Sequence, residues 1–149
     1  MWREAVAADD DAIVEMCLAL NAEDPGPEPV PEGHTRRTLA TLRAEPLRGR
    51  AVVLEVAGRA CGYALLISFW SNELGGELCE IDELYVARDE RGRGHARELL
   101  AGLASGALPW SVGSVALALE TTPTNSRARR LYERVGFHLH NQTMVLRRR

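Results

Sequence analysis

The spacing of apolar residues in the first third of the chain predicts a strand followed by two helices. The strand is expected over residues 2–6, and the acidic run from Asp9 to Asp11 then supplies helix-cap chemistry. Helical spacing follows at four apolar positions, Ile13, Val14, Cys17 and Leu18. The proline-rich segment 25–33 is incompatible with a helix and predicts a loop, after which residues 35–44 form a second, short helix.

Two apolar runs in the middle of the chain are typical of β-strands. Residues 51–56 and 61–69 are rich in apolar and β-branched side chains, and the segment between them, 57–60, predicts a hairpin. A second turn over residues 71–76 leads to a central strand at 78–86. Tight turns between consecutive strands indicate antiparallel pairing.

The apolar pattern slips by one position inside the strand at 78–86. Its apolar positions are odd-numbered before the slip and even-numbered after it, at Cys79, Ile81, Leu84 and Val86. Asp82 and Glu83 stand at the change. A one-residue slip of this kind is what a β-bulge produces, so a bulge is expected there.

The last third of the chain predicts a strand, a helix and two further short strands. Apolar residues alternate with small ones over 114–120, as expected of a strand. One apolar face recurs over 126–135, which predicts a helix that ends at Gly136. Two short strands are then expected within residues 137–146, before a solvated arginine tail.

Composition narrows the class of protein. At 149 residues the chain has the length of one ordinary domain, and its formal net charge of −3 disfavours non-specific binding to nucleic acid or to anionic membranes. Cys17, Cys61 and Cys79 are far apart and odd in number, so they are expected to be buried free thiols in a reducing cytosol. Without an apolar leader or a run long enough for a membrane span, a soluble cytoplasmic protein is expected.

The segment Arg91-Gly92-Arg93-Gly94-His95-Ala96 joins the predicted central strand to a helix through a short glycine turn. Backbone N–H groups at a helix start have no partners inside the helix, and the helix dipole is positive there. Glycine lets an anion approach these groups, so the segment predicts a diphosphate site. Two familiar phosphate motifs are excluded: Arg97 stands where a dinucleotide fingerprint needs its third glycine, and a P-loop needs a lysine, which the chain lacks.

This strand, turn and helix resemble the acyl-CoA signature of the GNAT superfamily of N-acetyltransferases, Arg/Gln-Gly-x-Gly-x-Gly/Ala after an aliphatic strand end. The match is carried by Val86, Arg91, Gly92, Gly94 and Ala96. The resemblance implies a single domain over residues 1–149 with a mixed α/β (α+β) fold. In that fold a central, mostly antiparallel twisted sheet is splayed between its fourth and fifth strands and flanked by helices.

The resemblance also implies acetyl-CoA as the cofactor and two sets of contacts to it. Backbone groups of Leu84, Tyr85 and Val86 would hydrogen-bond the pantetheine arm like an added strand and polarise the thioester carbonyl. The diphosphate would lie on the glycine turn and the first turn of the helix, at Arg91, Gly92, Arg93, Gly94, His95, Ala96 and Arg97. Arg91 and Arg93 would add positive charge to this site.

Asn125 and Tyr132 match a second signature of the same family, an Asn before the penultimate helix and a Tyr two turns later. By this resemblance Tyr132 is the general acid that protonates the CoA thiolate, and Asn125 positions the cofactor. The helical face alone also explains Tyr132 as a core residue with its hydroxyl at the rim. Both interpretations of Tyr132 stay open at this stage.

Three acidic residues, Glu80, Asp82 and Glu83, stand beside the predicted bulge, where the resemblance places the acceptor amine. A carboxylate there can attract a cationic amine and take its proton. Diamine acetyltransferases are similar at Asp82 and Glu83, which are the candidates for the base, although solvated strand carboxylates explain them too. Simple alternation places Glu80 and Asp82 on one face and Glu83 on the other, and a bulge leaves this assignment open.

The favoured function is direct transfer of an acetyl group, in a ternary complex, to a primary amine of a small cationic molecule. The turn with Trp70 and Glu73 and the acidic loop 23–34 are expected to shape the acceptor pocket. A protein or peptide amine is the alternative acceptor, and a non-catalytic acyl-CoA sensor is the alternative function. No third ligand accompanies His138 and His140, so no metal is expected, and a homodimer is suggested only by analogy with the fold.

Overall fold

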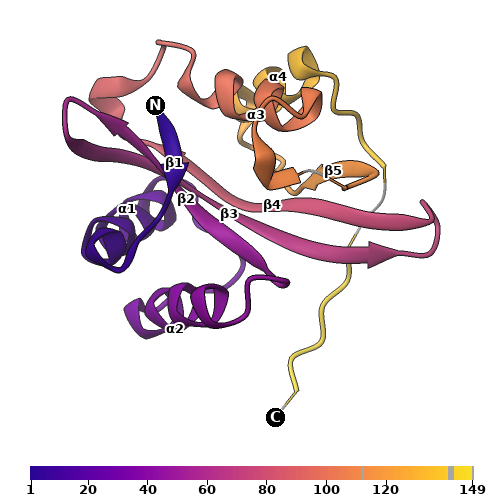
Figure 1. Cartoon of the computed structure of the whole chain (residues 1–149), viewed down its shortest axis with the longest axis horizontal. Coiled ribbons are helices and arrows are strands. Elements are labelled where there is room, and N and C mark those ends of the chain that lie inside the picture. The colour runs from indigo at the N-terminus through magenta and orange to yellow at the C-terminus, as the bar shows by residue number, and fades with distance from the viewer. Residues whose placement is uncertain (112, 141–142, 149) are drawn as a thin grey trace.

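The computed structural model describes residues 1–111, 113–140 and 143–148. Its centre is a five-stranded sheet whose strands follow one another in sequence order (Figure 1). The strands are β1 (Trp2–Glu4), β2 (Gly49–Val56), β3 (Arg59–Ser71), β4 (Gly76–Val86) and β5 (Ala116–Leu119). Neighbours are antiparallel from β1 to β4, and β5 runs parallel to β4. This mixed sheet confirms the fold class expected from the sequence.

Helices cover both faces of the sheet (Figure 1). One face carries α1 (Asp10–Glu23) and α2 (Glu32–Ala44), and the other carries α3 (His95–Ser105) and α4 (Ser126–Val135). A short 3-10 turn, η1 (Ala7–Asp9), precedes α1. Two others lie on either side of α3: η2 (Arg88–Glu90) before it and η3 (Pro109–Ser111) after it. Within the described residues, each helix is too short or too polar to cross a bilayer.

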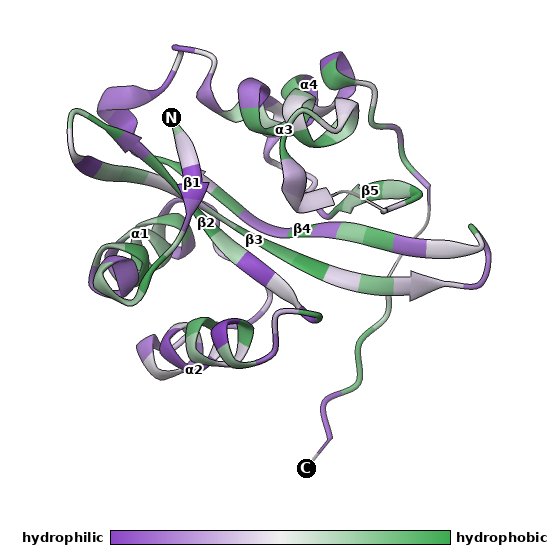
Figure 2. Cartoon of the chain, in the orientation of Figure 1, coloured by the Kyte–Doolittle hydropathy of each residue, from purple (hydrophilic) through white to green (hydrophobic). Residues whose placement is uncertain are grey.

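The sheet separates two apolar cores. Beneath α1 and α2 the core includes Ile13, Cys17, Leu39, Val53 and Tyr63. Beneath α3 and α4 it includes Val52, Leu54, Leu99, Leu100 and Leu103. Because both faces are covered, residues 51–54 and 61–66 are buried without interruption, and this produces the continuous apolar runs in the sequence. Figure 2 shows these apolar stretches along β2 and β3.

The bulge predicted in β4 is present. Leu65 of β3 pairs with Glu83, whereas the next residue, Leu66, pairs with Ile81, so Asp82 is the extra residue. Strand side chains alternate between faces, and one extra residue reverses that alternation. Glu80 therefore shares a face with Glu83, the face of α1 and α2. Simple alternation, which separates these two glutamates, is wrong here because it counts Asp82 as a paired position.

The ladder between β4 and β5 ends at the bulge. Its pairs run from Leu78 with Ala116 to Ile81 with Leu119. Residues 82–86 of β4 extend past the end of β5, which is the splay expected between the fourth and fifth strands. Among the described residues, the β5-facing edge of β4 therefore has no paired strand from Asp82 onward.

Several element boundaries differ from the sequence expectation. The second helix begins at Glu32 rather than at residue 35, because Pro31 stays extended at φ −63° and ψ 148° and forms the cap. β5 is shorter than the expected strand at 114–120. The three cysteines are free and buried, as expected.

The two short strands expected within residues 137–146 are not formed in the described segments 137–140 and 143–146, and positions 141–142 lie outside the described residues. The apolar side chains that gave rise to this expectation are 75–96% exposed, at Leu139, Met144, Val145 and Leu146. A strand needs a neighbour for its backbone groups, and this segment runs away from the sheet (Figure 1). The expectation was wrong because local apolar pattern does not identify a pairing partner.

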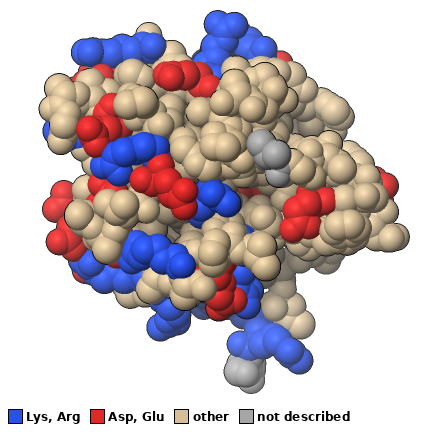
Figure 3. All heavy atoms as spheres, in the orientation of Figure 1, with Lys and Arg blue, Asp and Glu red and all other residues tan. Residues whose placement is uncertain are grey.

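Charged side chains of both signs are interspersed on the molecular face drawn in Figure 3. Arginines pair locally with carboxylates at several surface positions, for example Arg43 with Asp10 and Arg59 with Asp89. This face therefore offers no uniform basic stripe of the kind that tracks a nucleic-acid backbone.

Candidate active site

The glycine turn after β4 has the conformation that an anion site requires. Gly92 and Gly94 have φ values of +79° and +87°, and a Cβ at either position would meet no atom within 4 Å. Gly94 caps the N-terminus of α3, and no side chain makes a cap hydrogen bond there. The amides of His95, Ala96 and Arg97 begin the helix, where backbone N–H groups lack intrahelical partners. The turn thus leaves room for an anion beside the positive end of α3.

The start of α3 is held from two sides. Leu99, Leu100 and Leu103 bury one side of the helix in the core. The indole Nε1 of Trp2 donates a hydrogen bond to the His95 carbonyl at 2.9 Å. Sequence reasoning did not assign Trp2 to the site, since its partner lies 93 residues away.

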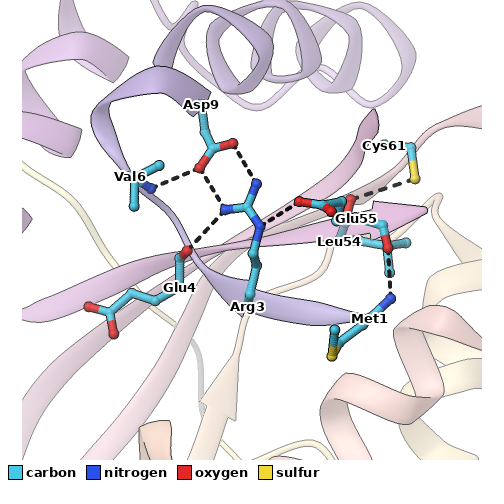
Figure 4. Close-up of polar contacts among 8 residues, drawn as sticks. All are labelled: Met1, Arg3, Glu4, Val6, Asp9, Leu54, Glu55 and Cys61. Atoms are coloured by element: carbon cyan, nitrogen blue, oxygen red, sulfur yellow. Dashed lines mark hydrogen bonds and ion pairs between the residues drawn. The ribbon is translucent and has the colours of Figure 1, made fainter. Parts of the chain in front are cut away.

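Strand β1, which carries Trp2, is fixed in turn by Arg3 (Figure 4). The Arg3 guanidinium donates to Glu55 at 2.7 Å and to both carboxylate oxygens of Asp9 at 2.8 and 2.9 Å. These bonds join β1 to β2 and to the turn before α1. The start of α3 is therefore tied, through Trp2, to a strand that two carboxylates hold in place.

Arg91 is engaged by the protein's own groups. Its Nε donates to the Val86 carbonyl at 2.7 Å, and its guanidinium lies 5.2 Å from the centre of the Tyr85 ring. Its NH2 group also pairs with Glu23 at 2.8 Å, and Arg88 pairs with the other Glu23 oxygen at 2.9 Å. Burial opposes ionisation of Glu23, but the two arginines outweigh it and hold its pKa below the ordinary value.

Asn125 is the N-cap of α4, and Tyr132 lies within that helix. The Asn125 Oδ1 accepts from the Ala128 N–H at 3.1 Å, so Asn125 caps the helix. Tyr132 is half-buried and meets Phe137 edge-on, with ring centres 6.1 Å apart. Burial raises the pKa of the Tyr132 hydroxyl, and the charge of Asp24 raises it further. Tyr132 is consequently protonated at neutral pH, as a general acid must be.

Glu83 is held by a buried tyrosine that the sequence did not reveal as part of the site. The Tyr63 hydroxyl donates to Glu83 Oε2 at 2.6 Å. Burial raises the pKa of Glu83; the Tyr63 bond opposes this shift and the charge of Asp82 adds to it. The pKa of the fully buried Tyr63 is itself far above the ordinary value because of burial and the charge of Glu83, so it remains a neutral donor.

Two further carboxylates crowd the bulge. Asp82 is exposed at its surface, but partial loss of hydration at the carboxyl raises its pKa, and Glu120, just after β5, raises it further. Burial also raises the pKa of Glu80, and the charges of Asp82 and Glu120 raise it by a smaller amount. The structure thus brings Glu80, Asp82 and Glu83 together and adds Glu120. Glu120 was missed because only the parallel pairing of β4 and β5 places it there.

Trp70 and Glu73 are not brought to this cluster. Trp70 pairs with Glu77 near the tip of the β3–β4 hairpin, five positions along β3 from Leu65, the partner of Glu83. At about 3.3 Å per residue this is roughly 16 Å, and Trp70 lies roughly 10 Å from Ile67, the partner of Glu80. Trp70 is 65% exposed, and Glu73 contacts His140 at 3.2 Å. The pattern of the turn carried no information on how far the hairpin extends beyond the helices.

Comparison with known proteins agrees with this geometry. The profile of the acetyltransferase (GNAT) family matches residues 7–137. A possible acetyltransferase from Clostridium difficile 630 is similar at a TM-score of 0.81 and 20% identity, over 99% of this chain and 96% of that one. A ribosomal-protein-alanine N-acetyltransferase from Brucella melitensis biovar Abortus 2308 is similar at 0.73 and 22%, over 99% of each chain. At these identities the structures show the fold alone, and no curated protein gives a significant match.

The residues present fit the cofactor that this family uses. The open glycine turn at the start of α3 suits a diphosphate, and the edge of β4 beyond its ladder with β5 suits an extended chain. The family profile spans both features together with α4. The chain therefore belongs to the GNAT family of N-acetyltransferases, whose cofactor is acetyl-CoA.

Proposed function

We propose that this enzyme acetylates a primary amine of a small molecule that carries at least one further positive charge. The observation that supports this acceptor is the crowding of half-buried Glu80 and Glu83 and exposed Asp82 at one bulge, where partial loss of hydration and like charge raise their pKa values. Such a cluster ionises reluctantly because its carboxylates are partly removed from water and repel one another. A cationic acceptor supplies that charge, and this favours its binding over that of a neutral amine.

Acetyl-CoA, when bound, supplies a thioester carbonyl that an amine can attack. The backbone N–H groups of the glycine turn would hold its diphosphate, with Arg93 and Arg97 adding positive charge. The exposed edge of β4 at Leu84 and Tyr85 would hold the pantetheine arm. Because Arg91 already binds the Val86 carbonyl, we expect that carbonyl to orient Arg91 rather than the cofactor.

Glu83 is the proposed base, with Asp82 as the second candidate. The Tyr63 hydroxyl fixes one oxygen of Glu83, and the raised pKa brings the carboxylate closer to the range in which a base works near neutral pH. The carboxylate takes a proton from the acceptor ammonium, and the amine nitrogen then forms a bond to the acetyl carbon. As the carbon–sulfur bond breaks, Tyr132 would donate its proton to the sulfur. The resulting tyrosinate would take the second proton from the new amide nitrogen, and Glu83 would release its proton to solvent.

The direct test of the acceptor is thiol release from acetyl-CoA with a panel of amines. The panel should contain diamines and polyamines, aminoglycosides, monoamines, amino acids and short peptides with free N-termini. We expect the multiply charged amines to have the highest kcat/KM. Faster turnover of peptides or of neutral amines would contradict the proposed acceptor while leaving the family assignment intact. CoA binding without turnover of any amine would instead indicate an acyl-CoA sensor.

Tyr132→Phe tests the proposed acid. Loss of the hydroxyl with the ring retained should lower kcat by roughly tenfold to a thousandfold. CoA affinity, measured by calorimetry, should stay close to that of the wild type because the ring still packs on Phe137. Wild-type turnover in this variant would make Tyr132 a core residue only.

A further inference from the structure

The C-terminal end of α1 is joined to the connection between β5 and α4 by one carboxylate. Asp24 directly follows α1, and its Oδ1 accepts a hydrogen bond from the Thr122 hydroxyl at 2.7 Å. Its Oδ2 accepts from Asn125 Nδ2 at 2.8 Å. These partners lie 98 and 101 residues away in the sequence. Asp24 is half-buried, and its two oxygens accept hydrogen bonds that join the end of α1 to the segment before α4.

The polarity of this contact is fixed by α4 itself. Asn125 uses Oδ1 to accept from the Ala128 N–H, so only its Nδ2 is available to Asp24. The Asn125 side chain therefore performs two functions, since it caps α4 and ties the cap to α1. Rotation of this amide would place an N–H against the Ala128 N–H and forfeit the cap.

α4 depends on this tie because its own packing is shallow. Every residue of α4 and of β5 is half-buried or exposed. By contrast, α1 buries Ile13, Val14, Met16 and Cys17, and α3 buries three leucines. Asp24 thus connects the least buried helix of the site to one that is firmly packed. Tyr132 lies seven residues after Asn125, about two turns along α4.

We propose that Asp24 is a positioning residue for Tyr132, holding the N-terminus of α4 so that the tyrosine hydroxyl meets the leaving sulfur. This inference rests on the proposed function, in which Tyr132 supplies the proton. The Asp24 carboxylate also lies near enough to Tyr132 for its charge to raise the pKa of the tyrosine hydroxyl. Asp24 itself touches neither substrate nor cofactor in this scheme.

The test is a double-mutant cycle between Asp24→Ala and Tyr132→Phe. Asp24→Ala should lower kcat about tenfold to a hundredfold through displacement of the acid, with CoA affinity within about threefold of wild type. In the Tyr132→Phe background the same substitution should have almost no further effect on kcat, because the acid is already gone. Asp10→Ala is the matched control, since Asp10 also makes two hydrogen bonds from α1, to Arg43, at 2.8 and 2.6 Å. It should leave kcat unchanged.

A reciprocal exchange checks the hydrogen bond independently. Asn125→Asp alone keeps the helix cap but opposes two carboxylates, so kcat should fall; adding Asp24→Asn restores a donor and should recover most of the loss. Wild-type kcat in Asp24→Ala, or equal losses in the two backgrounds of the cycle, would overturn the positioning role. Wild-type kcat in Tyr132→Phe would instead overturn the proposed acid, so the two failures are distinguishable.

Discussion

Gly94→Val would test the diphosphate site directly. Gly94 has φ +87° at the cap of α3, and a side chain there would project into the open space beside the helix N-terminus. Gly106→Val is a matched control, because Gly106 has φ +74°, meets no atom within 4 Å of an added Cβ and lies at the other end of the same helix. Both variants carry the same kind of backbone strain, but only Gly94→Val also obstructs the predicted anion site.

The magnitudes separate the two effects. A non-glycine residue in the left-handed region costs roughly 1–2 kcal/mol, which for a chain of this size lowers Tm by about 2–8 °C in either variant without ligand. CoA at about one hundred times its Kd stabilises the native state by about 2.7 kcal/mol. That corresponds to a Tm rise of roughly 5–11 °C. We expect this rise in the wild type and in Gly106→Val, and little or none in Gly94→Val.

Thermal unfolding with and without CoA measures both quantities in one experiment, and calorimetric titration confirms the loss of binding. An undiminished CoA-induced rise in Gly94→Val would refute the assignment of the diphosphate to this turn. Equal loss of the rise in both variants would show that strain in α3, rather than obstruction, is responsible.

Three further predictions concern charged side chains. Because burial raises the pKa of Glu83, its protonated form stabilises the fold at low pH, and this contribution is lost as pH rises through the folded-state pKa. Glu83→Gln should therefore have a higher Tm than the wild type at pH 8 but not at pH 4, and a larger Tm gain at pH 4 would contradict this. The same variant should have a lower kcat/KM, and its pH–rate profile should lose the acidic limb. Asp82→Asn should lower kcat/KM for diamines at least roughly fivefold more than for monoamines, as competition kinetics would show, and equal losses would exclude a charge contact. Glu23→Gln should strengthen CoA binding in calorimetry by freeing Arg88 and Arg91 from their carboxylate partner, and weaker binding would mean that the ion pair organises the site.

Local patterns predicted the elements that carry the cofactor site. The slip in apolar phase located the bulge at Asp82, and the apolar face of 126–135 gave both ends of α4, because helix caps and strand alternation are short-range properties. The glycine turn was recognised for the same reason, since its positive φ values are set within a few residues.

Long-range contacts were beyond the reach of these patterns. The bonds from Tyr63 to Glu83, from Trp2 to His95 and from Asp24 to Asn125 join positions 20 to 101 residues apart. No periodicity specifies which surfaces meet, and an acidic loop gave no sign that one of its carboxylates binds the cap of α4. The C-terminal strands were predicted wrongly for a related reason, because a strand is defined by a neighbour as much as by its own side chains.

The unequal burial of α3 and α4 predicts that the two helices differ in local stability. Amides in a helix anchored by buried leucines exchange with solvent only through large-scale unfolding, whereas amides in a shallowly packed helix exchange through small local openings. The amides of α3 should therefore be slow to exchange, and those of α4, which carries Tyr132, should be fast. Motion should then be concentrated in α4, so the position of the Tyr132 hydroxyl should vary more than that of the glycine turn.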